Sequence, residues 1–253
     1  MMRAVILAAG RGSRLGPRAS ERPKCLTWLG GARLLDHQRR ALQQCDVSER
    51  TIVVGFAARR VRAIDREQLV LNPEWANCGP IGSLSCVPRE QLRCGFVLIY
   101  GDCLFHPDHL RQLLACPHPL AMTSDDDWHA LWSLRMPQVL DDAEGFQRDG
   151  DRVLAIGGKA SRIGDIQGQF TGLLKVDPAA WRTIESMLDA MDPAHARKLD
   201  TTTLLSELIG RGQPVHLVPV RGRWLEVDTR RDLAQYRARL RRRLPWSHDW
   251  RWP

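Results

Sequence analysis

Short apolar runs alternate with amphipathic stretches along the first half of the chain. The apolar runs are nearly continuous, which is typical of strands buried on both faces of a parallel sheet. One stretch between them repeats its apolar positions with helical spacing. The pattern predicts strands over residues 3–9, 51–56, 70–72 and 96–101 and a helix over residues 34–44. Strands and helices that alternate in this way predict a doubly wound sheet.

The pattern becomes less regular after about residue 120. The expected strands cover residues 121–124, 132–136, 152–156, 168–176, 215–220 and 224–227, and the expected helices cover residues 179–191, 201–211 and 230–243. No internal repeat or low-complexity linker divides the chain. We therefore predict a single α/β domain over residues 1–240, with a Rossmann-like, mostly parallel mixed sheet flanked by helices.

Length and composition fit a cytoplasmic protein without a membrane partner. The 253 residues are 43% hydrophobic, which is enough for one sizeable core. No apolar run approaches membrane-spanning length, and residues 4–9 are too short for a signal peptide. Seven scattered cysteines form no C-x-x-C pair, as is typical of reduced thiols, and none of the eight histidines falls in a zinc motif.

The formal charge of +8 raises the question of a nucleic-acid partner. Much of the excess lies late in the chain, in Arg237, Arg239, Arg241, Arg242 and Arg243. Such a terminal cluster is weak support for nucleic-acid binding as the main function. We interpret residues 241–253 as a basic, tryptophan-rich tail outside the domain. Its tryptophans either stack on bases or lie at a membrane surface, or they belong to a solvated terminus.

The first strand leads into a turn of small residues followed by basic and hydroxyl side chains. Glycines let backbone N–H groups approach phosphate oxygens, and an arginine can bridge two such oxygens. Lys24 follows about a dozen residues later, close enough to fold back over the same phosphates. The predicted triphosphate contacts are Leu7, Ala8, Ala9, Gly10, Arg11, Gly12, Ser13, Arg14 and Lys24. The alternative is an ordinary strand-to-helix turn, because the segment matches neither the P-loop nor the full dinucleotide motif.

Two aspartates end predicted strands. Asp102 follows the clearest strand, at the place where α/β sheets put ligands and metals, and Asp228 follows residues 224–227. A carboxylate there can hold Mg²⁺ against nucleotide phosphates, because magnesium prefers hard oxygen ligands. The alternative for each aspartate is a cap at the end of its strand.

Taken together, these segments resemble the sugar-phosphate nucleotidylyltransferase superfamily, whose fold is glycosyltransferase-A-like. The resemblance rests on residues 7–15 and on Arg22-Pro23-Lys24 with Leu26. It implies that Arg14 and Lys24 carry triphosphate charge and stabilise the transition state. It also implies that Asp102 and Asp228 converge on one catalytic Mg²⁺. An acceptor oxygen then attacks the α-phosphorus in line, pyrophosphate leaves, and no covalent nucleophile is needed.

A loop rich in glycine and proline covers residues 72–84 and enters a predicted helix at Ser83. In the resembling families a segment at this place surrounds the nucleotide base. Gly79, Gly82 and Ser83 are therefore candidate base contacts. The alternative is a structural loop in which Ser83 is the N-cap of the helix.

Motifs in the second half resemble the cytidylyltransferases that activate phosphocholine or phosphonates. They lie at residues 125–128, 132, 141–144, 156–159, 168–173 and 224–228. This resemblance, over roughly residues 2–236, implies transfer of CMP from CTP to a small acceptor such as phosphocholine, 2-aminoethylphosphonate or a related phosphonate. It implies a nucleotide-binding half over residues 1–120 and an acceptor-binding half over residues 121–240.

Four side chains are predicted acceptor contacts. Lys159 aligns with a lysine that contacts the acceptor phosphate in sugar-nucleotide relatives, although Gly158 replaces the usual glutamate. Asp125, Trp128 and Trp224 pair acidic with aromatic groups that can hold a cationic amine. The alternatives are a solvated acidic turn and tryptophans packed in the core. A sugar-1-phosphate or other NTP-dependent nucleotidyltransferase is the alternative function, and the oligomeric state, including a homo-oligomer, stays open.

Overall fold

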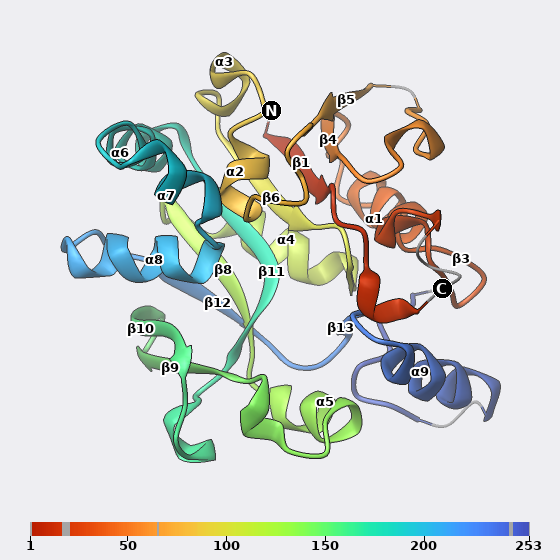
Figure 1. The fold of residues 1–253 in the computed structure, drawn as a ribbon. Coiled ribbons are helices and arrows are strands. Elements are labelled where there is room, and N and C mark those ends of the chain that lie inside the picture. The colour runs from red at the N-terminus through yellow and green to blue at the C-terminus, as the bar shows by residue number, and fades with distance from the viewer. Residues whose placement is uncertain (1, 17–20, 65, 243–244, 253) are drawn as a thin grey trace.

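One nine-stranded sheet runs through the protein in a computed structural model that describes residues 2–16, 21–64, 66–242 and 245–252. Helices flank this sheet (Figure 1). In spatial order its strands are β5 (Glu67–Leu71), β4 (Arg50–Val54), β1 (Arg3–Ala8), β6 (Phe96–Tyr100), β11 (Gln169–Val176), β8 (Leu120–Asp125), β12 (His216–Val220), β10 (Arg152–Lys159) and β9 (Glu144–Asp149). Strands from both halves of the chain therefore share one sheet.

The sheet is parallel on one side and mixed on the other. β1 pairs in parallel with β4 and β6, and β4 pairs in parallel with β5. β11 is antiparallel to both β6 and β8. The residues of β4 are all buried, which accounts for the continuous apolar run in the sequence. The predicted α/β class with a mixed sheet flanked by helices is confirmed.

Helices and two small ribbons complete the domain. The ribbons pair β2 (Trp28–Leu29) with β3 (Ala32–Arg33) and β7 (Cys103–Phe105) with β13 (Trp224–Glu226). The helices are α1 (Leu34–Gln43), α2 (Pro80–Leu84), α3 (Arg89–Leu92), α4 (Pro107–Ala115), α5 (Trp128–Arg135), α6 (Pro178–Asp189), α7 (Pro193–Lys198), α8 (Thr201–Gly210) and α9 (Arg230–Arg242). Among the described residues, no helix combines the length and the apolar character needed to cross a membrane.

The prediction of a strand over residues 132–136 was wrong. Residues 132–135 belong to α5, which buries Trp128, Leu131, Trp132 and Arg135. These positions are three and four residues apart, the period of a helix. The two tryptophans favour a strand by their intrinsic propensity, but their packing in the core decides the structure.

The C-terminal segment packs on the domain, which corrects the interpretation of residues 241–253 as a tail outside it. Residues 241 and 242 end α9. Trp250 is fully buried, and its ring meets the edge of the His37 ring at a centroid distance of 5.6 Å. His248 is also fully buried, with Nε2 2.8 Å from Oδ2 of Asp125. Burying the large apolar area of the aromatic rings favours packing on the domain, although the neighbouring residues are positively charged.

Candidate active site

Lys24 brings together the two aspartates that the resemblance assigns to a metal. Its Nζ lies 2.5 Å from Oδ2 of Asp102 and also donates to Oδ1 of Asp228. The lysine side chain is only 14% exposed, so the three charges meet in a largely enclosed place. The fold therefore assembles this cluster from three segments that are far apart in the sequence.

The ribbon of β7 and β13 fixes the two aspartates side by side. Asp102 directly precedes β7, and Asp228 lies two residues after β13. The strands are antiparallel, with Glu226 opposite Cys103. Val227 N donates to Asp102 O at 3.1 Å. Main-chain hydrogen bonds therefore hold the carboxylates together, independently of their side chains.

The turn after β1 wraps around the stem of Lys24. Gly12 has φ 69°, in the left-handed region that glycine adopts without strain. A Cβ at this position would lie 3.1 Å from Cβ of Lys24. Lys24 N donates to Gly10 O at 3.3 Å. The turn therefore needs a glycine both for its backbone conformation and for the close approach of the lysine.

Two arginines of the turn lie at its outer side. Arg14 Nη2 is 3.3 Å from Oδ1 of Asp228, and the arginine side chain is 63% exposed. Arg11 places its guanidinium over the Phe56 ring, 5.2 Å from the centroid. Figure 1 shows the segment after β1 close to β13 and α9. Both guanidinium groups therefore remain available to an anion that enters beside Lys24.

A cavity of about 210 Å³ opens beside Asp102. Nothing lies within 4 Å of the position that a Cβ of Gly10 would occupy, so the glycine backbone faces open space. The lining residues come from β1, the loop before α2, α2 itself and the end of β6: Leu7, Ala9, Gly10, Trp75, Cys78, Gly79, Pro80, Ser83, Tyr100 and Asp102. The cavity therefore joins the predicted base loop to the turn and to one aspartate.

In the predicted base loop, residues 72–84, Gly79 and Ser83 line the cavity, whereas Gly82 serves the packing of α2. Ser83 lies inside α2, whose N-cap is Gly79, and its Oγ accepts a hydrogen bond from Asn72 Nδ2 at 3.0 Å. The alternative of Ser83 as N-cap was therefore wrong. A Cβ on Gly82 would lie 2.2 Å from Arg197 O. Gly82 thus allows α2 to pack on the chain before residue 198, and it lies outside the lining of this cavity.

Arg135 holds Asp228 from its buried side. The arginine side chain is fully buried, and Nη2 lies 2.9 Å from Oδ2 of Asp228. The same guanidinium pairs with Glu226 and lies 3.5 Å from Asp232. Asp232 accepts hydrogen bonds from the backbone N of Asp228 at 2.9 Å and of Thr229 at 2.8 Å. The sequence analysis missed this support, because no motif marks Arg135 and its partners lie more than ninety positions away.

The groups of this cluster shift one another's pKa values in different directions. Burial alone lowers the pKa of Lys24, but Asp102 and Asp228 reverse this effect and raise the pKa above its usual range. Burial raises the pKa of Asp228, but Lys24 and Arg135 bring it below its usual value. Burial, with Asp228 and Asp102 nearby, raises the pKa of Glu226 to about 8 despite Arg135. Near neutral pH, Lys24 and Asp228 are therefore charged, and Glu226 takes up a proton more readily than an ordinary glutamate.

The structure does not bring the predicted acceptor residues to this cavity. Asp125 and Trp224 are fully buried and Trp128 is 4% exposed. Asp125 Oδ1 accepts a hydrogen bond from Gly222 N at 2.8 Å, and its other oxygen faces His248. As placed, these three side chains have almost no surface for a ligand, which corrects their prediction as acceptor contacts. Lys159 is exposed at the end of β10 and stays a predicted contact.

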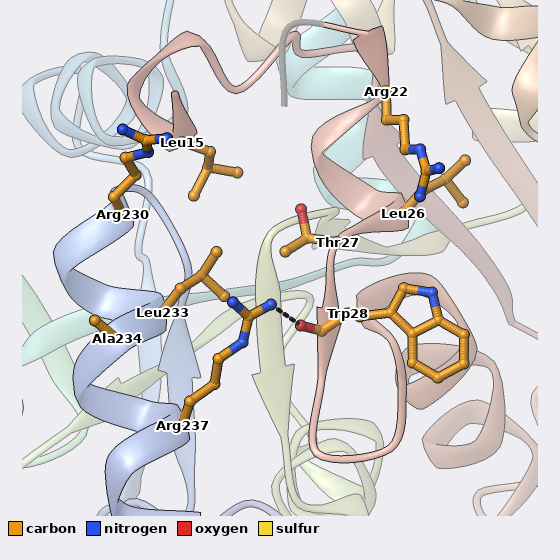
Figure 2. Close-up of a pocket in the computed structure, with 9 residues that line it drawn as sticks. All are labelled: Leu15, Arg22, Leu26, Thr27, Trp28, Arg230, Leu233, Ala234 and Arg237. Atoms are coloured by element: carbon orange, nitrogen blue, oxygen red, sulfur yellow. Dashed lines mark hydrogen bonds between the residues drawn. The ribbon is translucent and has the colours of Figure 1, made fainter. Parts of the chain in front are cut away.

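A second cavity, of about 440 Å³, is lined in part by Arg22, Leu26, Thr27 and Trp28, the residues on either side of Lys24 in the chain. Figure 2 shows Leu26, Thr27 and Trp28 on one wall, and Leu15 beside the residues of α9 on the other. Arg237 donates to Trp28 O at 2.9 Å across the cavity. Three guanidinium groups border it, those of Arg22, Arg230 and Arg237. Such a border favours anionic ligands.

The carboxylates fit the predicted Mg²⁺. Oxygens of Asp102 and Asp228 already point to one place, where both contact the same Lys24 nitrogen. Magnesium is held by one or two carboxylates together with substrate phosphates and water. The second oxygen of Asp228 is held by Arg135, which fixes the direction of the carboxylate. The donor set and its rigidity therefore match a magnesium site.

Comparisons with known proteins point to one family. A family model for the MobA-like NTP transferase domain matches residues 4–242. The chain is 26% identical over 247 residues to CTP:phosphoglutamine cytidylyltransferase from Campylobacter jejuni, which covers 92% of this chain and 98% of that protein. It is 34% identical over 155 residues to CMP-5'-(3-aminopropyl)phosphonate synthase from Streptomyces rubellomurinus. That match covers 58% of this chain but only 24% of the synthase.

Two solved structures share the fold. CTP:phosphocholine cytidylyltransferase from Streptococcus pneumoniae matches with a TM-score of 0.73 at 22% identity, over 94% of this chain and 99% of that one. The inositol-1-phosphate CTP transferase from T. maritima matches with a TM-score of 0.74 at 18% identity, over 95% and 96% of the two chains. The fold of this chain is therefore also that of these two transferases.

Proposed function

The chain belongs to the MobA-like NTP transferase family, and from this premise we propose that it transfers CMP from CTP to a small acceptor with a phosphate or phosphonate group. An acceptor oxygen attacks the α-phosphorus, the bond to the bridging oxygen breaks, and pyrophosphate leaves. The observation that carries the proposal is the meeting of Lys24, Asp102 and Asp228 beside the glycine turn.

The choice of CTP is supported by the relatives. The names of the proteins from Campylobacter jejuni and Streptomyces rubellomurinus refer to CTP or CMP. Their names join that nucleotide to phosphoglutamine in one case and to an aminoalkylphosphonate in the other. The cavity beside Asp102 is also small, about 210 Å³ against the usual range of roughly 300–1,000 Å³ for ligand pockets. A small cavity suits a single-ring base.

The turn and Lys24 have the reach and charge to hold the triphosphate. The open backbone at Gly10 offers room for phosphate oxygens, and Arg11 and Arg14 supply guanidinium groups beside it. Lys24 remains charged at neutral pH and can exchange a carboxylate partner for a phosphate oxygen. Positive groups fixed at the phosphates stabilise the negative charge that builds up on the leaving pyrophosphate.

We propose that Asp102 and Asp228 hold the Mg²⁺ ion, which when bound supplies positive charge to the phosphate oxygens. Arg135 keeps Asp228 in place for this role, and the β7–β13 ribbon keeps Asp102 beside it. The exposed Lys159 and the arginine-bordered cavity of Figure 2 are the candidate contacts for the anionic acceptor.

Pyrophosphate release tests this function directly. The protein is incubated with Mg²⁺, each of the four NTPs in turn, and phosphocholine, 2-aminoethylphosphonate, phosphoglutamine or glucose 1-phosphate. We expect turnover with CTP and at least one of the first three acceptors, and none with Lys24→Met. Turnover with another NTP and glucose 1-phosphate, without any product from CTP, would contradict the proposal and favour a sugar-1-phosphate nucleotidyltransferase.

A further inference from the structure

Two histidines and an aspartate meet on the surface away from Lys24. The rings of His118 and His216 are stacked, with centroids 3.4 Å apart and planes within 5°. Oδ2 of Asp151 lies 3.1 Å from Nε2 of His118 and 3.6 Å from Nδ1 of His216. One ligand atom from each residue lies within 4.8 Å of the other two.

Neighbouring strands hold these three residues in place. His118 lies two positions before β8, His216 is the first residue of β12, and Asp151 directly precedes β10. β12 pairs with both β8 and β10. Leu217 N donates to Asp151 O at 2.7 Å, so the backbone of the aspartate is fixed to β12. The sheet therefore places the three side chains next to one another before any ligand arrives, and the stacked rings have to turn about their side-chain torsions for both nitrogens to face one ion.

The cluster of His118, Asp151 and His216 and the candidate active site lie at opposite ends of the strands of the sheet. His216 pairs with Ala121 near the start of β8, and the start of β8 is level with Phe96 through β11. Phe96 begins β6, whereas Asp102 follows the end of β6. The length of a five-residue strand, about 17 Å, separates the two ends. The cluster is therefore a separate site.

We propose that His118, Asp151 and His216 bind a divalent transition-metal ion, for which Zn²⁺ is the best fit. Imidazole nitrogen and carboxylate oxygen bind zinc at about 2.0–2.2 Å, which in a tetrahedron separates neighbouring ligand atoms by about 3.3–3.5 Å. The observed separations of 3.1 and 3.6 Å bracket this range. A water molecule completes the tetrahedron, and the half-exposed side of Asp151 gives access to solvent.

The chemistry of the donors separates this site from a magnesium site. Nδ1 of His216 is buried and has no hydrogen-bond partner within the part of the chain that the structure describes. A buried nitrogen of this kind needs a partner, and a metal ion is one. Imidazole favours zinc, copper or nickel over Mg²⁺, which prefers oxygen ligands. Excess Mg²⁺ therefore leaves the site available to zinc.

Titration with Co²⁺, a coloured substitute for Zn²⁺, tests the proposal on the full chain. Excess Mg²⁺ is present to occupy the carboxylates near Lys24. We expect one tight ion per chain, visible absorption without a thiolate charge-transfer band in the near ultraviolet, and displacement by Zn²⁺. Asp151→Asn and His118→Ala should each weaken Co²⁺ binding tenfold or more. His129→Ala, which removes an exposed histidine outside the cluster, should leave the affinity unchanged.

Thermal unfolding gives a second measurement. Zn²⁺ should raise the melting temperature of the wild type, because a ligand that binds only the folded state stabilises it. The same Zn²⁺ concentration should leave the melting temperature of Asp151→Asn unchanged. Because the Asp151 side chain is 60% exposed, we expect this variant to fold as the wild type does. Unchanged Co²⁺ affinity in both cluster variants, or a thiolate band at the tightest site, overturns the proposal.

Discussion

Asp102 and Asp228 share Lys24, but only Asp228 also neutralises a buried arginine. Arg135 has no exposed side-chain surface, and one of its ion pairs is with Asp228 at 2.9 Å. Removing one partner of a buried charge is costly, because the remaining charge loses its compensation. The two aspartates therefore have equal importance for the proposed chemistry and unequal importance for stability.

Substituting the two aspartates separates these roles. We expect Asp102→Asn and Asp228→Asn each to lower turnover by on the order of a hundredfold or more. Each substitution removes a proposed ligand of the Mg²⁺ ion that supplies positive charge to the phosphates. Asp228→Asn should in addition lower the free energy of unfolding by about 1–3 kcal/mol, and Asp102→Asn by much less. Pyrophosphate release and urea unfolding measure the two effects. Near-wild-type turnover in both variants would remove the metal assignment.

Glu226 makes stability depend on pH. Burial raises its pKa to about 8 in the folded state, from the 4.5 of an ordinary glutamate. The folded state therefore binds the extra proton between these values. The resulting stabilisation is complete below the lower value and is lost as pH rises through about 8. We expect the unfolding free energy of the wild type, relative to Glu226→Gln, to fall as the pH rises from about 5 to about 8 and to level off above that. A flat difference over that range, measured by urea unfolding, contradicts this assignment.

The residues at strand ends were the predictable part of this site. Lys24, Asp102 and Asp228 could be singled out because a turn or a strand end places each of them at the carboxyl edge of the sheet. Arg135 could not, because it lies inside a helix and acts on residues that only the tertiary fold brings near. Asp125 and Trp224 were assigned to the acceptor because a sequence does not state burial.

At the scale of elements, the segment after α9 shows how strongly packing overrides charge. Trp250 lies against His37 and within reach of Gly30, where a Cβ would meet its ring at 3.0 Å. His248 and Asp125 add a buried pair at 2.8 Å. This segment is thus part of the core, although it follows a helix with several arginines.

Truncating Trp250 should therefore destabilise the protein. We expect Trp250→Ala to lower the unfolding free energy by about 3–5 kcal/mol, because it removes a fully buried aromatic ring and leaves a cavity. Trp28, a residue that is 50% exposed, is the matched control, and Trp28→Ala should change the unfolding free energy by less than about 0.5 kcal/mol. Urea unfolding measures both. A loss of less than about 0.5 kcal/mol in Trp250→Ala would show that residues 245–252 contribute little.

Elements with one clear period were predictable, and those that depend on partners were not. β1, β4 and β6 show in the sequence because both of their faces are buried. The pattern analysis missed α4 and the short strand β7. In α4, acidic and histidine residues interrupt the apolar positions, and β7 is too short to show a pattern. For α5, the tryptophans favoured the prediction of a strand, and the helical spacing of its buried residues became clear only from the structure.

At the scale of the whole molecule, a group of positive charges lies near the candidate active site. Five arginines line a cavity of about 360 Å³ that also contacts Leu26, two residues from Lys24: Arg22, Arg33, Arg59, Arg60 and Arg62. A cavity with one sign of charge draws in ligands of the opposite sign and loses this effect as salt screens it. An anionic nucleotide should therefore be captured faster at low salt.

Salt should accordingly weaken the proposed reaction. We expect kcat/KM for CTP to fall by on the order of tenfold between about 0.05 and 0.5 M NaCl. Replacing Arg59, Arg60 and Arg62 with Gln should flatten this dependence. Replacing Arg152, Arg182 and Arg211 with Gln removes the same net charge elsewhere and should leave the slope unchanged. Identical slopes in the two triple variants, from pyrophosphate-release kinetics, would show that only net charge matters.

The packing of Trp250 against the segment near residue 30 also sets an order of events during synthesis. That segment leaves the ribosome about 220 residues before its partner, which corresponds to roughly 10–40 s of translation. Throughout this interval the leucines and glycines around residue 30 lack their cover. The surface around residue 30 therefore stays uncovered until the residues around 250 have left the ribosome.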